Sequence, residues 1–237
     1  MEIVLGKKTC VITGVGWGTG NAIARKFASS GYSVAMLARR GDRLEQLESE
    51  IENAHAFPCD VTDTTALKET LKKITKDLGH PSVVIHNAVS GAWGTFIEID
   101  PSDLENTFQV NTMALLHLAQ FTLPKMMEAG YGSLICTGNT AAHRGRAGYA
   151  AFAPTKAAQR ILAQSIAREA GPKGVHVAYV TIDAVIDLRW TRKRYPDKPD
   201  DFFIKPEEIA DEVFHVANQS KGAWSFDVEI RPHAENW

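Results

Sequence analysis

Short apolar runs alternate with helical segments along almost the whole chain, and this alternation limits the possible fold more than any other feature. The runs at 8–14, 32–39, 82–88, 132–138 and 174–182 are rich in apolar and β-branched residues, and an amphipathic or helix-length stretch follows each. Strands separated by such helices imply βαβ crossovers and a parallel sheet covered on both faces. The sequence predicts one α/β domain over 1–237 with a doubly wound parallel sheet of about seven strands.

Only one stretch interrupts this alternation. Residues 183–205 read DAVIDLRWTRKRYPDKPDDFFIK and show no clear helix or strand pattern. No linker rich in Gly, Ser or Pro divides the 237 residues, so a second domain is not expected. A segment of this length without regular structure inside a compact domain is usually functional or mobile.

Composition excludes several classes of function. The net charge of −2 gives no reason to expect a nucleic-acid partner. No apolar run reaches membrane-spanning length and the first residues are too short for a secretory signal, so we expect a cytoplasmic protein without a membrane partner. The three cysteines are widely separated, which favours reduced, buried thiols. No His, Cys and carboxylate spacing predicts a metal site.

The first apolar run ends in the glycine-rich segment TGVGWGTGNA, residues 13–22, which opens a helix. Glycines there permit a tight turn and let backbone N–H groups and a helix N-terminus approach a pyrophosphate. The position of this loop, after a strand and before a helix at the start of a βαβ run, is the context that a dinucleotide-binding loop requires. The loop therefore predicts a bound dinucleotide.

The spacing Thr13-Gly14-x₃-Gly18-Thr19-Gly20 resembles the cofactor loop of the short-chain dehydrogenase/reductase superfamily, and the resemblance extends from about residue 5 to 182. It implies a Rossmann-type domain that binds a nicotinamide dinucleotide. The loop residues that it assigns to cofactor binding are Gly14, Trp17, Gly18, Thr19 and Gly20. By the same resemblance, CDVTD at 59–63 assigns Asp60 and Val61, HNAV at 86–89 assigns Asn87, Ala88 and Val89, and the end of the sixth strand assigns Ile182.

The end of the second apolar run, MLARRGD, bears on the choice of cofactor. An acidic residue there would bind the ribose hydroxyls of NAD(H) and repel a 2′-phosphate, but this chain has Ala38 followed by Arg39 and Arg40. Guanidinium groups bind phosphate bidentately, so NADP(H) is preferred over NAD(H), the alternative being a solvated basic pair. Asp42 is expected to cap the next helix.

Two side chains that the resemblance implies for carbonyl chemistry have changed. Aligned on Lys156, the family's tyrosine falls on Phe152 and its serine falls on Asn139, whereas Asn111 and Lys156 are kept. The resemblance also assigns Lys156 to cofactor binding, at the nicotinamide ribose. Phe152 holds no transferable proton, so the usual carbonyl route should be strongly impaired. The amide of Asn139 can still donate to a substrate oxygen.

Three functions remain open from the sequence. The first is an oxidoreductase with an altered proton source, because Tyr149 and Lys156 resemble the spacing in enoyl-thioester reductases of the superfamily, which reduce a C=C bond. The second is a catalytically inactive NADP(H)-binding sensor or subunit. The third is a lyase or isomerase that uses the nucleotide structurally.

The resemblance also implies partners. The segment 183–205 would close over substrate, and its basic residues would suit a small molecule such as an acyl thioester; a solvated loop with balanced charges is the alternative. The predicted fourth and fifth helices, about 101–129 and 149–170, commonly pair across a two-fold axis in the family. We therefore expect a symmetric homo-oligomer, a dimer or a tetramer.

Overall fold

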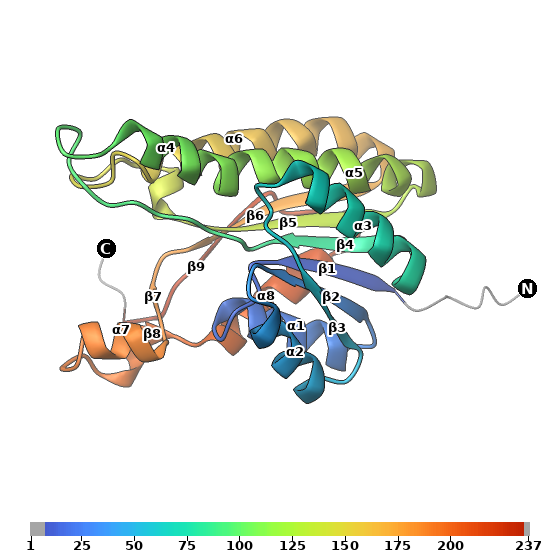
Figure 1. The fold of residues 1–237 in the computed structure, drawn as a ribbon, viewed down its shortest axis with the longest axis horizontal. Helices are drawn as coiled ribbons and strands as arrows, with labels where there is room; N and C mark the ends of the chain where they lie inside the picture. Colours follow the sequence, from blue (N-terminus) through green and yellow to red (C-terminus); the bar gives the residue numbers. More distant parts are fainter. Residues whose placement is uncertain (1–7, 235–237) are drawn as a thin grey trace, which may run out of the picture.

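The structure, a computed structural model, describes residues 8–234; residues 1–7 and 235–237 of the predicted domain lie outside the described residues. Its main sheet contains β1 (Thr9–Thr13), β2 (Ser33–Ala38), β3 (Ala54–Pro58), β4 (Pro81–His86), β5 (Gly132–Asn139), β6 (Val175–Ile182) and β9 (Asp227–Ile230). The strand order is β3-β2-β1-β4-β5-β6-β9, and all neighbours are parallel (Figure 1). The single-domain α/β prediction with a seven-stranded sheet is confirmed.

Helices cover both faces of the sheet, as Figure 1 shows. One face carries α1 (Thr19–Ser29), α2 (Gly41–Glu50) and α8 (Pro206–Ala217). The other carries α3 (Thr64–Leu78), α4 (Pro101–Phe108), α5 (Ala114–Ala129) and α6 (Ala153–Ala170). A π-helical turn, Gln109–Met113, joins α4 to α5 without a break in the helix.

Each strand supplies side chains to two separate cores because successive residues of a strand point to opposite faces. In β2, Val34 and Met36 pack towards α1 and α8, whereas Ala35 and Leu37 pack towards α3. The strands β2, β1, β4, β5 and β6 are buried on both faces, which explains why the sequence shows continuous apolar runs there instead of alternation.

The chain reverses its direction of travel across the sheet between β1 and β4. From β1 it proceeds outwards through β2 to β3, and then β4 returns to the other side of β1 and continues to β5 and β6. In open parallel sheets, ligands bind at this switch point, outside the carboxyl ends of the strands. The loop 14–18 after β1 and the segment 87–100 after β4 leave the sheet at this place.

Two helix starts differ from the expectation. The helix predicted over 149–170 begins only at Ala153, because Pro154 occupies its first turn and Gly148 has a φ of 77° in the turn before it. Asp42 is not the cap of α2: Arg40 takes the N-cap position without a side-chain hydrogen bond, and Asp42 lies in the first turn. There its carboxylate interacts favourably with the positive end of the helix dipole and stabilises α2.

The segment 183–205 is more regular than its sequence suggests. It contains the short strands β7 (Val185–Ile186) and β8 (Phe203–Ile204), which pair in parallel, and a short helix α7 (Arg189–Arg194). Phe203, Ile204 and Thr191 are buried, and Arg192 lies 4.0 Å above the Phe203 ring. These contacts give the segment a defined position below the carboxyl ends of β6 and β9 (Figure 1).

Candidate functional site

The glycine loop is shaped by positions where no side chain fits. Gly14 has a φ of 73°, and a Cβ atom on it would lie 2.5 Å from the Cα atom of Ala88. A Cβ atom on Gly20 would lie 2.6 Å from the carbonyl oxygen of Gly14. Contacts this short do not occur, so the loop after β1 depends on glycine at both positions. Helix α1 begins at Thr19, directly after Gly18, and presents its first N–H groups at the loop.

Asn87 fastens this loop to the neighbouring strand ends. Its Nδ2 donates to the carbonyl oxygen of Gly14 at 3.1 Å, and its Oδ1 accepts from the hydroxyl of Thr137 at 3.0 Å. The backbone N–H of Ala88 donates to the Thr13 hydroxyl at 3.2 Å. The ends of β1, β4 and β5 are thereby held in one arrangement at the switch point.

The remaining predicted cofactor residues lie around the same edge. Val61 and Ala88 are buried in one small apolar cluster, and Asp60 accepts from the N–H and the hydroxyl of Thr62. Val89 is 62 % exposed beyond β4. Ile182, the last residue of β6, lies beside Asn139 in the register of the sheet. The structure brings all of them to the carboxyl ends of the strands.

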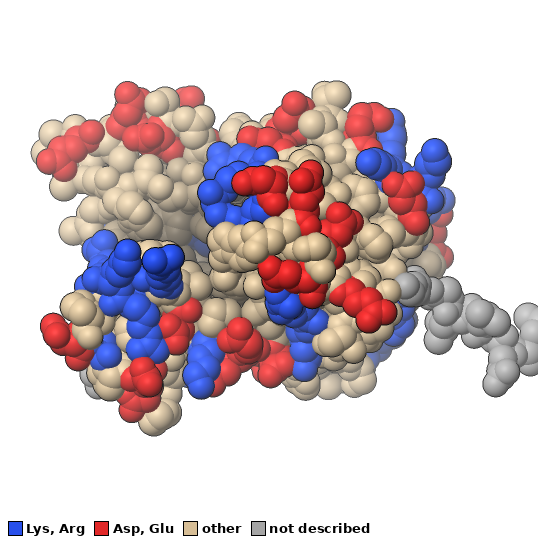
Figure 2. Space-filling model, turned by 60° about the horizontal axis from the view of Figure 1, so that its bottom comes forward, with Lys and Arg blue, Asp and Glu red and all other residues tan. Residues whose placement is uncertain are grey.

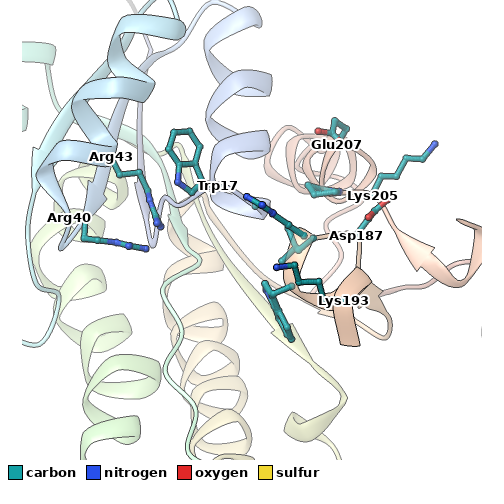
Figure 3. Close-up of a pocket in the computed structure, with 12 residues that line it drawn as sticks. Trp17, Arg40, Arg43, Asp187, Lys193, Lys205 and Glu207 are labelled. Carbon is teal, nitrogen blue, oxygen red and sulfur yellow. The ribbon is translucent and has the colours of Figure 1, made fainter. Parts of the chain in front are cut away.

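A cleft of about 1190 Å³ opens beside the glycine loop. Trp17, Arg40 and Arg43 stand on one wall, and Asp187, Lys193, Lys205 and Glu207 stand on the other (Figure 3). The remaining lining residues are Gly18, Leu188, Arg189, Trp190 and Pro206. Five of its side chains are cations and two are carboxylates, so the cleft suits an anionic ligand.

Arg43 lies closest to the loop itself. Its guanidinium is 5.6 Å from the centre of the Trp17 ring, and a Cβ atom on Gly16 would lie 3.2 Å from its Nη1. Partial burial, and then the nearby charge of Arg40, lower the pKa of Arg43. Of the two arginines singled out in the sequence, Arg40 lines the cleft, whereas Arg39 is exposed and is absent from its lining.

These features fit the phosphates of a dinucleotide. The tight turn that Gly14 and Gly20 permit sets the N-terminus of α1, at Gly18, against the space of the cleft. Arg40 and Arg43 supply planar donors beside that space. The loop residues and the two arginines would hold the pyrophosphate and an additional phosphate, respectively.

Lys156 lies in a buried polar network rather than at the surface. Its side chain is 2 % exposed, and its Nζ donates to the carbonyl oxygen of Thr137 at 3.2 Å and to Oε1 of Gln159. The hydroxyl of Tyr179 donates to the same Oε1 at 3.3 Å, and Nε2 of Gln159 donates to the carbonyl oxygen of Asn111 at 2.7 Å. Burial lowers the pKa of Lys156 to about 8.

The pKa values of the groups around Lys156 are shifted in the directions expected from their burial and from the charge of Lys156. Burial, and then the charge of Lys156, lower the pKa of His86 to about 4, so this imidazole is neutral at pH 7. Its Nδ1 meets the hydroxyl of Thr13 at 3.0 Å. Burial raises the pKa of the Cys136 thiol to about 12. Cys10 and Cys59 are likewise buried free thiols.

Asn111 uses its whole side chain for contacts within the chain. It exchanges two hydrogen bonds with the backbone of Ser90, each 3.0 Å long, and donates to the hydroxyl of Thr155 at 2.9 Å. Its position in the π-helical turn aims it between the segment after β4 and the start of α6. Asn111 therefore fixes these two elements to each other.

Three aromatic rings fill the space in front of α6. Trp93 packs on Phe152 with ring centres 4.6 Å apart and on Tyr149 with centres 4.7 Å apart. Phe152 is 4 % exposed under this cover. Among the contacts of the described residues, none joins the Tyr149 hydroxyl to Lys156, and Tyr149 lies in the turn that precedes the helix.

Asn139 is the last residue of β5. Its Oδ1 accepts from the N–H of Ala141 at 3.1 Å, which starts the 3-10 turn Thr140–Ala142. Its Nδ2 donates to no group among residues 8–234 and remains available as a donor. A substrate oxygen beside the end of β5 can therefore receive a hydrogen bond but no proton from Asn139.

Comparison with known proteins agrees with this geometry. Residues 8–191 match the family model described as short chain dehydrogenase. The chain belongs to the short-chain dehydrogenase family. An uncharacterized oxidoreductase of Staphylococcus epidermidis is 26 % identical over 227 residues, which are 95 % of this chain and 97 % of the relative.

Solved structures of short-chain dehydrogenases share the fold. A metagenomic short-chain oxidoreductase in complex with NADP has a TM-score of 0.83 at 28 % identity, with 96 % of this chain and 98 % of that chain covered. The alcohol dehydrogenase of Thermococcus sibiricus, complexed with 5-hydroxy-NADP, has a TM-score of 0.83 at 26 % identity, covering 97 % and 98 %. Membership of the family assigns this chain to the oxidoreductases.

The sequence pattern alone did not identify several residues of this short-chain dehydrogenase site. Arg43 follows Arg40 by three residues, so its place on the same helix face was a usable signal. Gln159 follows Lys156 by the same spacing, but a helical glutamine is ordinarily exposed. Trp93 gave no signal, because its contact with Phe152 joins segments 59 residues apart. Within 8–234 the structure holds no helix able to span a membrane and no cluster of three metal-ligating side chains.

Proposed function

We propose that this chain is an NADP(H)-dependent oxidoreductase that transfers a hydride at a site without the tyrosine and serine of its family. The observation that carries the proposal is the cleft in which Arg40 and Arg43 stand beside the glycine loop. The two related structures that contain NADP or a derivative support the same cofactor. β2 ends in Ala38, so the strand-end position at which an acidic residue would repel a 2′-phosphate carries no charge.

The side chains at the ends of β5 and α6 favour reduction of a C=C bond over reduction of a carbonyl. A bound nicotinamide supplies the hydride. Phe152, at the family's tyrosine position, has no proton to donate to an alkoxide. When hydride adds to the β-carbon of an enoyl thioester, the electron pair of the double bond moves to the carbonyl oxygen, where the Nδ2–H of Asn139 can stabilise the enolate.

The α-carbon must then receive a proton. Tyr149 is the candidate donor, because its hydroxyl has no partner among the described residues and the ring lies beside Phe152 at the end of the cluster. Asn111 and Lys156 act in this proposal by holding the start of α6 and the end of β5 in place. The segment 183–205 would form the lid on the substrate side.

Transfer of deuterium from labelled NADPH tests the reaction. The protein is incubated with NADPH deuterated at C4 and, separately, with enoyl thioesters and with ketones, and products are analysed by mass spectrometry. We expect deuterium at the β-carbon of a saturated thioester and little in any alcohol. Tyr149→Phe should slow the reaction about 10²-fold if the phenol supplies the proton. Deuterated alcohol as the main product would contradict the choice of substrate.

One observation favours a second candidate, a protein that binds NADP(H) without catalysis. Lys156 donates into the core to Gln159 and Thr137, and Trp93 covers Phe152, so this site is packed more closely than a reaction would require. Tight binding of NADPH without transfer of deuterium to any thioester or ketone would select this candidate. A product formed with unchanged cofactor would instead indicate a lyase or isomerase.

We also propose that two copies associate through α4, α5 and α6. Ile161 supports this interface, because its side chain is 54 % exposed on the outer face of α6. Leu115, Leu118 and Ala119 do not contribute, since they pack into the chain's own core. Light scattering tests the proposal: Ile161→Asp should shift a dimer or tetramer towards the monomer, and a wild-type monomer would contradict it.

A further inference from the structure

The wall of the cleft that faces Arg40 and Arg43 belongs to the segment after β6 and is basic as well. Arg189 and Lys193, both from α7, line it. Figure 3 shows the Lys193 side chain extended towards the opposite wall, and Figure 2 shows basic side chains gathered on both sides of a hollow on this face. The proposed function uses only the basic residues after β2 for the extra phosphate, so the second basic wall has no role in it so far.

Several contacts fix the position of α7 against the glycine loop. A Cβ atom on Gly18 would lie 2.8 Å from Cδ2 of Leu188, so this leucine rests on the loop. The N–H of Leu188 donates to the hydroxyl of Thr191 at 2.9 Å, and that buried hydroxyl donates to the carbonyl oxygen of Ile186 at 2.6 Å. Lys193 therefore comes from a helix whose start is held at the loop.

Some cations of α7 form salt bridges with carboxylates and others do not. Arg192 contacts both oxygens of Asp187 at 2.7 Å and also contacts Asp200, so the carboxylate of Asp187 is already neutralised. Arg189 and Lys193 contact no carboxylate among residues 8–234. Arg40 and Arg43, across the cleft, form no salt bridge within those residues either, although the charge of Asp42 acts on Arg43. These four cations line the cleft together with Lys205, and only Asp187 and Glu207 among the lining residues carry a negative charge. A multiply charged anion would relieve the repulsion among the cations.

We propose that Lys193 and Arg189 complete the binding site for the 2′-phosphate of the cofactor, so that this phosphate is held between α7 and the start of α2. This inference rests on the proposed use of NADP(H). A dianionic phosphate offers three oxygens, enough for two guanidinium groups on one side and an ammonium on the other. Discrimination between NADPH and NADH then depends on the segment after β6 as well as on the end of β2.

Calorimetric titration of Lys193→Gln with NADPH and with NADH tests the assignment. Removing a charge–charge contact at this partly exposed position should weaken NADPH binding about fivefold and NADH binding less than twofold. Arg189→Gln should act in the same direction. Arg194→Gln is the matched control, because Arg194 belongs to the same helix but does not line the cleft. It removes the same net charge and should leave both affinities within twofold.

The outcomes distinguish the role of α7 from the proposed use of NADP(H). Unchanged NADPH affinity in Lys193→Gln and Arg189→Gln would overturn the role of α7 and leave the proposed function intact. An equal loss for NADPH and NADH would also overturn it, since the contact would then be with the pyrophosphate. Failure of the wild-type protein to bind NADPH would overturn the proposed function together with the inference. Equal losses of NADPH affinity in Arg194→Gln and Lys193→Gln would mean that the effect comes from the net charge of the protein, and would refute a specific site.

Discussion

Replacing Lys156 by methionine should change how the stability of the protein depends on pH. Among residues 8–234 the buried ammonium has two acceptors, the Thr137 carbonyl oxygen and Oε1 of Gln159. Burial disfavours its charged form, so its pKa falls to about 8 in the fold from an ordinary value of 10.5. Methionine has a similar length and no charge, and it fills the same space without this penalty.

The sign follows from proton binding in the two states. Between pH 8 and pH 10.5 the unfolded chain keeps the proton on Lys156 whereas the folded chain has released it, so the free energy of unfolding rises with pH in this window. At about 1.4 kcal/mol per pKa unit, the whole window corresponds to about 3 kcal/mol. Below pH 8 both states are protonated and this contribution is constant at its least favourable value.

Urea unfolding at pH values from 7 to 10.5 measures the effect in both proteins. The wild type should gain about 3 kcal/mol over this range relative to Lys156→Met. Groups that titrate there without interacting with Lys156 are present in both proteins and cancel in the difference. Gln159→Leu removes one acceptor of the ammonium, so its own rise should begin below pH 8.

Parallel stability curves would refute this reasoning. A difference that stays within about 0.5 kcal/mol from pH 7 to 10.5 would mean that Lys156 keeps its ordinary pKa. The ammonium would then be hydrated, and the buried network with Gln159 and Tyr179 would not describe the protein in solution. A difference that falls with pH would contradict even the direction of the shift.

Two further predictions concern the loop and the aromatic cluster. Gly14→Ala should lower the free energy of unfolding by more than about 2 kcal/mol because its Cβ atom would meet Ala88. Gly31→Ala, also at positive φ but with open space around it, should lower it by about 1 kcal/mol. Equal losses in denaturant unfolding would contradict the close approach of Gly14 to Ala88. Phe152→Tyr combined with Asn139→Ser should confer NADPH-dependent reduction of ketones that neither single variant shows, and inactivity of a folded double variant would mean that the surrounding pocket no longer admits a carbonyl.

The sheet and its helices could be predicted from the sequence because the five central strands, β2, β1, β4, β5 and β6, are buried on both faces. Runs such as VVI in β4 and LIC in β5 then read as unbroken apolar segments between helices. The segment 183–205 could not be predicted. Its short strands pair only with each other, and its helix is six residues long, so neither leaves a periodic pattern.

The candidate site divides in the same way. Residues that act through the backbone, such as Gly14 and Gly20, are tied to a loop whose spacing identifies it. Residues that act through contacts distant in the sequence, such as Trp93 on Phe152, carry no local signal. Lys156 belongs partly to this second group: its bond to Gln159 lies within one helical turn, whereas its bond to the carbonyl oxygen of Thr137 joins residues in different elements and carries no local signal.

Calorimetric titration of the wild-type protein with NADPH and with NADH is the most direct test of the account as a whole. The account predicts one binding event per chain for NADPH, at least about tenfold tighter than for NADH, since two arginines and α7 surround the additional phosphate. Absence of heat with both dinucleotides, or tighter binding of NADH, would contradict it.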